Sequence, residues 1–273
     1  MGKGLKAGSL AVVTGASSGL GVDFARSLAR RKVDVILTAR REDRLKEVAA
    51  EVSGRFGVTA HVLPHDLGSP EAAEGLAAKI DERGLAPNIL VNNAGFGLNG
   101  PFIEQPWDTL ATMIGVNVLA LARLAHLYGG RFAAGGEGYI LNVASFVAIQ
   151  PCPTLAVYAG TKGFALGFSR SLREELKSQG VRVTALCPGF TETEFFDRAD
   201  FEQSRGMKRL MLKSAAVAEA GVRGMLRGKD MVIPGVLWRL NYWLVSSVPR
   251  WMAMGVTKNL VAPSPESEAE PNA

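Results

Sequence analysis

Tyr158 and Lys162 are the side chains of this sequence best placed to move a proton. They stand four residues apart in the stretch 155–179, where apolar spacing predicts a helix, so both project from one face. A phenol with a pKa of about 10 is a poor acid or base at neutral pH, and a nearby ammonium should lower that pKa. Ser145 follows a predicted strand at 138–143 and would hydrogen-bond the substrate oxygen with which Tyr158 exchanges a proton. These side chains predict proton transfer to or from a carbonyl or alcohol group.

A glycine-rich turn follows the apolar run 10–14, which is typical of a buried parallel strand. Glycine is needed because the turn requires unusual backbone angles and because phosphates must approach main-chain N–H groups closely. A helix follows and directs its positive end at the phosphates. Strand, turn and helix together predict a cradle for a dinucleotide pyrophosphate, formed by Gly15, Ser17, Ser18, Gly19, Leu20 and Gly21. An ordinary tight turn is the alternative.

The end of the second predicted strand, 33–38, indicates which dinucleotide binds. An acidic residue there would bond the ribose hydroxyls of NAD and repel a 2′-phosphate. This sequence continues instead with Arg40 and Arg41, and a guanidinium holds phosphate through two parallel hydrogen bonds. We therefore predict NADP, with Arg40 as the main contact and Arg41 as a second one. A solvated helix entry is the alternative for both arginines.

The spacing Gly15-x-x-x-Gly19-x-Gly21, with Asn92-Asn93-Ala94-Gly95 and Tyr158-x-x-x-Lys162, resembles the short-chain dehydrogenase/reductase family. The resemblance runs from about residue 10 to residue 193, more weakly through Pro234-Gly235, with the motifs in family order. It implies catalytic roles for Ser145, Tyr158, Lys162 and Asn117, the last in a water-mediated proton relay to Lys162. A helix-interior asparagine bonded to backbone is the alternative for Asn117.

The same resemblance implies further cofactor contacts. Asp66 would bond the adenine amino group and Leu67 would pack beside it. Lys162 would also hold the nicotinamide ribose, while the Thr191 backbone and the Thr193 hydroxyl would fix the carboxamide. The remaining cofactor-binding residues that the resemblance implies are Asn93, Ala94, Gly95, Tyr158, Pro188 and Gly189.

Strands and helices alternate between these motifs. Predicted strands lie at 10–14, 33–38, 59–63, 89–92, 138–143, 181–186 and 230–234, and predicted helices after the glycine turn and near 44–56, 70–83, 107–132 and 155–179. This alternation predicts an α/β fold, a doubly wound parallel sheet of the Rossmann type, in a single domain over residues 1–260. Ligands bind beyond the carboxyl ends of such strands, where every motif falls.

Composition bounds the remaining interpretations. The net charge is +5, but Lys and Arg are scattered, which favours an anionic small ligand over nucleic acid. Cys152, Cys187 and the three histidines show no disulfide or metal-ligand spacing, so we expect no metal and a reducing compartment. With no secretory signal and no uncharged run long enough to span a bilayer, we expect a cytoplasmic protein without a transmembrane segment.

The substrate should contact two apolar segments, 146–155 and a lid at about 190–216. They predict a lipophilic ketone or alcohol (ketoacyl, steroid-like or aromatic), unless the lid packs on itself. The Trp-rich segment 231–256 favours a cleft wall or subunit contact, and peripheral membrane contact stays open. The Pro/Ser/Glu tail 261–273 should be disordered. By resemblance, helices 107–132 and 155–179 form the interface of a homodimer or homotetramer.

Two classes of function compete. The first is an NADP-dependent oxidoreductase acting on a carbonyl or alcohol. The second is a catalytically idle NADP-binding sensor or scaffold on the same fold, whose expected mark is a broken Ser/Tyr/Lys set. That set is intact here, which favours the enzyme. A sugar-nucleotide epimerase is disfavoured by the short chain and the different glycine spacing.

Overall fold

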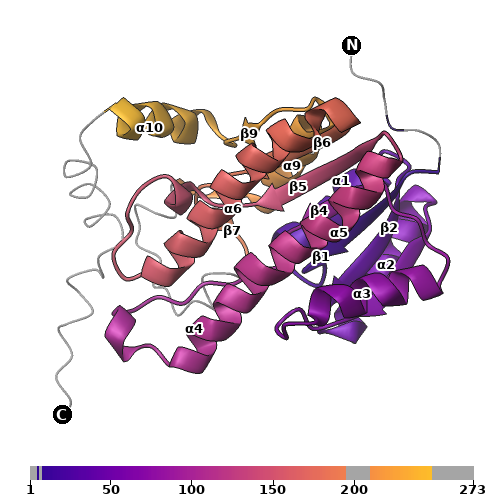
Figure 1. Cartoon of the computed structure of the whole chain (residues 1–273), viewed down its shortest axis with the longest axis horizontal. Coiled ribbons are helices and arrows are strands. Elements are labelled where there is room, and N and C mark those ends of the chain that lie inside the picture. Colours follow the sequence, from indigo (N-terminus) through magenta and orange to yellow (C-terminus); the bar gives the residue numbers. More distant parts are fainter. Residues whose placement is uncertain (1–4, 6–7, 195–209, 248–273) are drawn as a thin grey trace.

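The computed structural model describes residue 5, residues 8–194 and residues 210–247, and its centre is a seven-stranded parallel sheet (Figure 1). The strand order is β3-β2-β1-β4-β5-β6-β9. The strands are β1 (Leu10–Thr14), β2 (Asp34–Ala39), β3 (Ala60–Pro64), β4 (Ile89–Asn92), β5 (Gly138–Val143), β6 (Val181–Leu186) and β9 (Met231–Val232). The predicted doubly wound α/β class is therefore confirmed.

Helices cover both faces of this sheet. One face carries α1 (Gly19–Ala29), α2 (Glu42–Phe56) and α9 (Ser214–Leu226), and the other α3 (Ala72–Glu82), α5 (Leu121–Ala134) and α6 (Ala156–Leu176). Shorter pieces are η1 (Phe102–Glu104), α4 (Trp107–Ile114), η2 (Gly115–Ala120), η3 (Phe146–Ala148) and η4 (Lys177–Gln179). α10 (Val236–Ser247) follows β9.

β1 shows why the apolar runs form buried strands. Leu10 and Val12 pack into the apolar cluster under α3 and α5, while Ala11 and Val13 pack into the cluster under α1, α2 and α9. Successive side chains of a strand point to opposite faces, so a strand covered on both sides must be apolar throughout. That requirement produces the continuous runs seen in the sequence.

The order in which successive strands are added to the sheet reverses between β1 and β4, which are parallel neighbours at its centre. Connections from these two strands lead to opposite sides, so the turns that follow them diverge. A crevice opens at such a switch point, beyond the carboxyl ends of the strands. The turn after β1 begins at Gly15 and the one after β4 contains Asn93, so both predicted cofactor motifs meet there.

Several predicted elements differ in extent from those observed. The long helix predicted near 107–132 is a continuous helical stretch in three parts, because a π-helical segment, η2, separates α4 from α5. The last strand, predicted over 230–234, shortens to the two residues of β9. Within the lid region, β7 (Thr191–Glu192) pairs with β8 (Leu212–Lys213).

Two predicted regions fall partly or wholly beyond the described residues. Residues 195–209 of the predicted lid, residues 248–256 of the Trp-rich segment and the tail 261–273 lie outside them. The division into one domain and a disordered tail stays a prediction.

One helical stretch, Trp107–Ala134, is long and apolar enough to cross a membrane by length and composition. Its α5 part contributes Leu124, Tyr128 and Phe132 to the apolar cluster on the sheet. A helix that covers a sheet must be apolar on that side, which accounts for much of its hydropathy. The absence of a transmembrane segment stays a prediction.

A partly exposed ion pair joins the end of α1 to α9. Arg31 Nη1 donates to Glu219 Oε2 at 3.0 Å, and Ser27 Oγ donates to the same oxygen at 2.8 Å. The hydrogen bonds from the Arg31 guanidinium hold the pKa of the Glu219 carboxyl below its usual value. The pair therefore stabilises the fold when Glu219 is ionised, and this contribution is lost as the pH falls through the folded pKa.

Glu219→Gln should lower the free energy of unfolding by about 0.5–1 kcal/mol at neutral pH, a value discounted for partial solvent exposure of both side chains. The difference from the wild type should shrink at about pH 4, where Glu219 of the unfolded chain is largely protonated. Urea unfolding at both pH values measures it. A difference of equal size at both would contradict an electrostatic origin.

Candidate active site

A cavity of about 390 Å³ lies at the carboxyl ends of the central strands. Its wall includes all of the predicted cofactor-binding residues except Gly21, which lies beneath the turn, and three of the four predicted catalytic residues, Ser145, Tyr158 and Lys162. Asn117, the fourth, is fully buried behind the wall. The volume is within the range of small-molecule sites. The fold therefore brings these scattered motifs together in one place.

The glycine turn has the close packing that a phosphate cradle requires. A Cβ on Gly15, whose φ is +67°, would lie 2.9 Å from Asn93 Nδ2 and 3.0 Å from Ala94 Cα. A Cβ on Gly21 would lie 2.1 Å from the Gly15 carbonyl oxygen. Both positions therefore exclude any side chain, and the turn leads directly into the N-terminus of α1. Backbone N–H groups at such a terminus favour a bound anion, so the residues present fit a dinucleotide.

Thr14, the last residue of β1, fastens the two turns of the crevice together. Its hydroxyl accepts hydrogen bonds from the backbone N–H groups of Asn93 and Ala94, both at 2.9 Å, and donates to the Val91 carbonyl at 3.3 Å. Asn93 Nδ2 donates to the Thr14 carbonyl at 2.8 Å. These bonds explain why an asparagine motif after β4 accompanies a glycine motif after β1.

The two predicted phosphate-binding arginines differ in their surroundings. Arg40 is exposed at the rim of the cavity. Arg41 lies on the glycine turn, where its Nη2 donates to the Ser17 carbonyl at 3.3 Å and to Glu194 Oε2 at 3.1 Å. The guanidinium of Arg41 is therefore held beside the phosphate cradle by a carboxylate from the opposite side of the cavity.

Asp66 and Leu67, predicted to contact adenine, also line the cavity. Asp66 Oδ1 accepts a hydrogen bond from the Gly68 backbone at 3.0 Å, which closes a tight turn after β3. Leu67 is buried in the apolar cluster beneath. The turn thus directs the carboxylate to the cavity and the leucine to the core.

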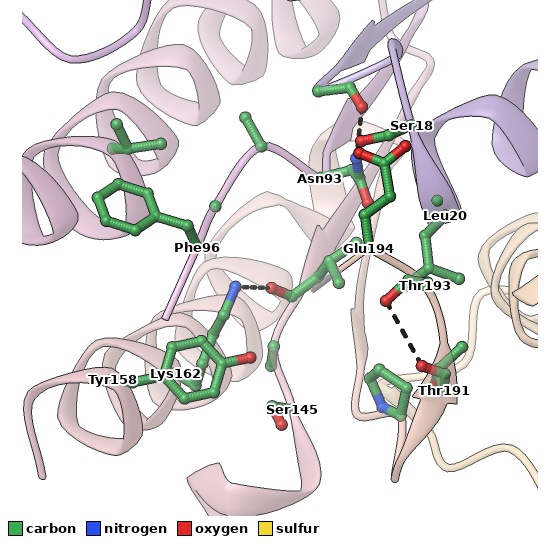
Figure 2. Close-up of a pocket in the computed structure, with 18 of the residues that line it drawn as sticks. Ser18, Leu20, Asn93, Phe96, Ser145, Tyr158, Lys162, Thr191, Thr193 and Glu194 are labelled. Atoms are coloured by element: carbon green, nitrogen blue, oxygen red, sulfur yellow. Dashed lines mark hydrogen bonds between the residues drawn. The ribbon is translucent and has the colours of Figure 1, made fainter. Parts of the chain in front are cut away.

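Ser145, Tyr158 and Lys162 converge on one point of the cavity wall (Figure 2). Tyr158 and Lys162 come from one face of α6, and Ser145 lies two residues beyond β5. A side-chain hydrogen bond joins Tyr158 to Ser145. Lys162 Nζ donates to the Val143 carbonyl at 2.9 Å and lies 5.8 Å from the centroid of the Tyr158 ring.

The pKa values of this pair depart from the prediction. Burial raises the pKa of Tyr158 to about 12, although the hydrogen bond with Ser145 acts in the opposite direction. Burial likewise lowers the pKa of Lys162 to about 8. The expectation that Lys162 lowers the Tyr158 pKa is therefore wrong here, because desolvation dominates and the ammonium bonds a backbone carbonyl. Tyr158 keeps its proton at neutral pH.

Asn117 lies in the π-helical segment η2 and is completely buried. Its Nδ2 donates to the Phe96 carbonyl at 2.9 Å and to Thr161 Oγ1 at 3.0 Å, and its Oδ1 accepts from the Phe96 N–H at 3.1 Å. Backbone bonding, the alternative for this residue, is thus present. A Cβ on Gly95 would lie 2.8 Å from Asn117 Oδ1 and 3.2 Å from Lys162 Nζ. The side chains of Asn117 and Lys162 therefore both approach Gly95. A proton relay between them stays a prediction.

The segment after β6 forms the remaining wall, from Pro188 to Glu194. Thr191 Oγ1 donates to the Gly189 carbonyl at 2.9 Å, and Thr193 Oγ1 donates to the Thr191 carbonyl at 3.4 Å (Figure 2). A Cβ on Gly19 would lie 3.1 Å from the Thr193 side chain. This segment therefore contacts the glycine turn directly.

Trp238 of α10 closes the cavity with an aromatic wall. Its ring centroid lies 4.8 Å from that of Phe146 and 5.2 Å from that of Phe190, both edge-on. A Cβ on Gly189 would lie 2.0 Å from the indole, so Trp238 packs directly on that backbone. The cleft-wall interpretation of the Trp-rich segment thus holds for Trp238.

Sequence reasoning missed other residues of the wall. Glu194 follows Thr193 without any pattern that would indicate a partner at Arg41. Asn241 reaches the cavity because it lies three residues after Trp238 on the same helix face. The three-residue spacing from Trp238 could have indicated Asn241 from the sequence. The described residues contain no group of three or more His, Cys, Asp and Glu side chains placed to hold a metal.

Comparisons with known proteins agree with this geometry. The family model described as short chain dehydrogenase matches residues 9–203. The chain belongs to the short-chain dehydrogenase/reductase family. It is accordingly an oxidoreductase that acts on carbonyl or alcohol groups.

Individual relatives cover most of the chain. The very-long-chain 3-oxoacyl-CoA reductase of Rattus norvegicus is 31% identical over 265 residues, which cover 94% of this chain and 82% of the relative. Among solved structures, a short-chain dehydrogenase from Sphingobium yanoikuyae in complex with NADPH has a TM-score of 0.77 and 30% identity, with 89% of this chain and 97% of that chain covered. L-sorbose reductase from Gluconobacter frateurii, complexed with NADPH and L-sorbose, has a TM-score of 0.74 and 26% identity, with 83% and 95% covered.

Gly21→Ala should abolish tight dinucleotide binding, with a dissociation constant at least about tenfold higher, because the new Cβ would displace the Gly15 carbonyl from the turn. Fluorescence titration with NADPH measures it. Gly54→Ala in α2 is the matched control, since a Cβ there meets nothing within 4 Å. The control should bind normally and gain up to about 1 kcal/mol of stability. Unchanged NADPH binding by Gly21→Ala would contradict the assigned cradle.

Proposed function

We propose that this protein is an NADP(H)-dependent reductase of a ketone on a lipophilic substrate, with the 3-oxoacyl class as the leading candidate. The observation that carries the proposal is that Tyr158 and Ser145 line the same cavity as the aromatic wall of Phe146, Phe190 and Trp238. The polar pair receives a carbonyl oxygen, and the wall receives an apolar group next to it. We include a cytoplasmic location in the proposal.

The reaction needs a hydride and a proton. The glycine turn, Arg40, Arg41 and the segment 188–193 would hold NADPH, which would supply the hydride to the carbonyl carbon when bound. Tyr158 Oη donates the proton to the carbonyl oxygen, which the Ser145 hydroxyl also hydrogen-bonds. A phenol with a pKa of about 12 is protonated at neutral pH, so Tyr158 can act as the general acid of the reduction.

The choice of NADP over NAD rests on charge. Ala39 ends β2 where a carboxylate would repel a 2′-phosphate, and Arg40 and Arg41 follow it on the cavity wall. Arg41 is already oriented by the Ser17 carbonyl. The NADPH complexes of the Sphingobium and Gluconobacter proteins support the same choice.

The substrate class rests on the chemistry of the wall and on the relatives. The residues around Tyr158 are mainly apolar and include Val147, Cys152 and Leu155 besides the aromatic wall. A cavity of this kind favours an apolar chain or ring beside the ketone. The similarity to very-long-chain 3-oxoacyl-CoA reductases favours an acyl chain over a steroid or sugar.

Tyr158→Phe should reduce the rate of 3-oxoacyl reduction by at least about a hundredfold, because the proton donor is lost. NADPH binding, measured by fluorescence, should stay within about twofold of the wild type, since the phenyl ring still fills the site. Substrates with longer acyl chains should give higher kcat/KM than short ones. If no ketone is reduced while NADPH binds normally, the protein is an NADP sensor or scaffold and the enzymatic proposal is wrong.

Glu194→Gln should tighten NADPH binding about two- to fivefold, because Arg41 no longer pairs with a carboxylate that competes with the 2′-phosphate. NADH lacks that phosphate, so its binding should be unchanged. Titration of both cofactors measures the two constants. The control is the same change in an Arg41→Ala background, where it should have no effect. If the variant binds NADPH and NADH more weakly by the same factor, Glu194 instead supports the binding of both cofactors, and the proposed competition with the 2′-phosphate is wrong.

A further inference from the structure

The two faces of α10 have different surroundings. Trp238 and Asn241 point into the catalytic cavity. The other side carries large apolar side chains that are 60–68% exposed: Val236, Leu237, Leu240, Trp243 and Leu244. We call this set the α10 stripe. Figure 1 shows α10 at the outer edge of the described structure, on the side of the sheet where β9 lies.

The residues of the stripe form one continuous band. Their spacing, with steps of three and four, places them on a single side of an α-helix. Such a band normally faces the core, as in α1, where Phe24 and Leu28 are completely buried. α10 already supplies the core from its other side through Trp238. The stripe is therefore apolar surface in excess of what packing among the described residues uses.

The charge beside the stripe favours an anionic partner. Arg239 is the one charged residue of α10 (Val236–Ser247), which contains no Asp or Glu. Arg239 lies on α10 beside the stripe and is exposed. Long basic side chains at the edge of an apolar helix face, together with Trp, are typical of helices that lie in the headgroup region of a membrane.

The size of the stripe argues against a stable subunit contact built on it alone. The stripe consists of five exposed side chains on one helix, whereas a stable protein–protein interface uses about 20–30 residues from each partner. A stable dimer needs about 800 Å² from each partner. A lipid surface has no such threshold, because each apolar side chain that enters it contributes separately.

We propose that the α10 stripe inserts into the interfacial region of a bilayer that contains anionic lipid, with Arg239 at the headgroups. This places the Trp238 wall of the catalytic cavity at the membrane surface. An apolar substrate dissolved in the bilayer would then reach the cavity beside α10. Membrane binding is measured without cofactor or substrate, so its outcome is independent of the proposed reaction.

The test uses the full chain and vesicle flotation. Vesicles of phosphatidylcholine alone are compared with vesicles of phosphatidylcholine and phosphatidylglycerol in equal parts. The wild type should float with the mixed vesicles and more weakly with phosphatidylcholine. Leu240→Glu, at a position 60% exposed, should reduce the floated fraction at least about tenfold, since a carboxylate opposes both insertion and the anionic surface.

Ile103→Glu is the matched control, because it makes the same type of change at an apolar residue 89% exposed on η1, away from α10. It should float as the wild type does. Thermal unfolding and NADPH titration of both variants establish that they fold.

Three results would overturn the proposal. They are a wild type that does not float, equal loss by both variants, and a Leu240→Glu variant that floats normally. If the wild type does not float and sedimentation velocity shows that Leu240→Glu splits an oligomer, the α10 stripe is a subunit contact.

Discussion

The close approach of two turns at the centre of the sheet is the constraint on which the site depends. Gly15 follows β1, Asn93 follows β4, and the space between them has no room for a Cβ. The Thr14 hydroxyl joins the turns by bonding backbone on the β4 side. Because the strand order reverses here, this contact fixes the floor of a crevice whose walls come from distant segments.

Burial at the catalytic end has a cost that the fold offsets locally. Lys162 is 4% exposed, and its ammonium bonds the carbonyl of Val143 at the end of β5. Asn117 holds the Phe96 backbone within the same cluster, and the π-helical segment η2 supplies its position. Such segments are rare and often occur at functional sites, because they redirect one side chain within a helix. The polar groups are therefore bonded before any ligand binds.

Much of this arrangement was predictable because it follows from the periodicity of apolar residues and from the spacing of glycines. Alternating apolar strands and helices indicated the sheet, and the spacing of Gly15, Gly19 and Gly21 indicated the cradle. The Tyr158 pKa was not predictable, because it depends on how deeply α6 packs, which no spacing reveals. Glu194 was missed for a related reason, since its partner Arg41 is far away in sequence and the pair forms only once the fold is complete.

The raised pKa of Tyr158 also bears on its role as a general acid. A general acid must hold its proton in the free site, and a phenol with a pKa of about 12 does so throughout the physiological range. The reverse reaction needs the phenolate, which the same burial disfavours. The hydrogen bond with Ser145 opposes this burial effect. The site as folded thus keeps the acid ready and stabilises its anion where the reaction produces it.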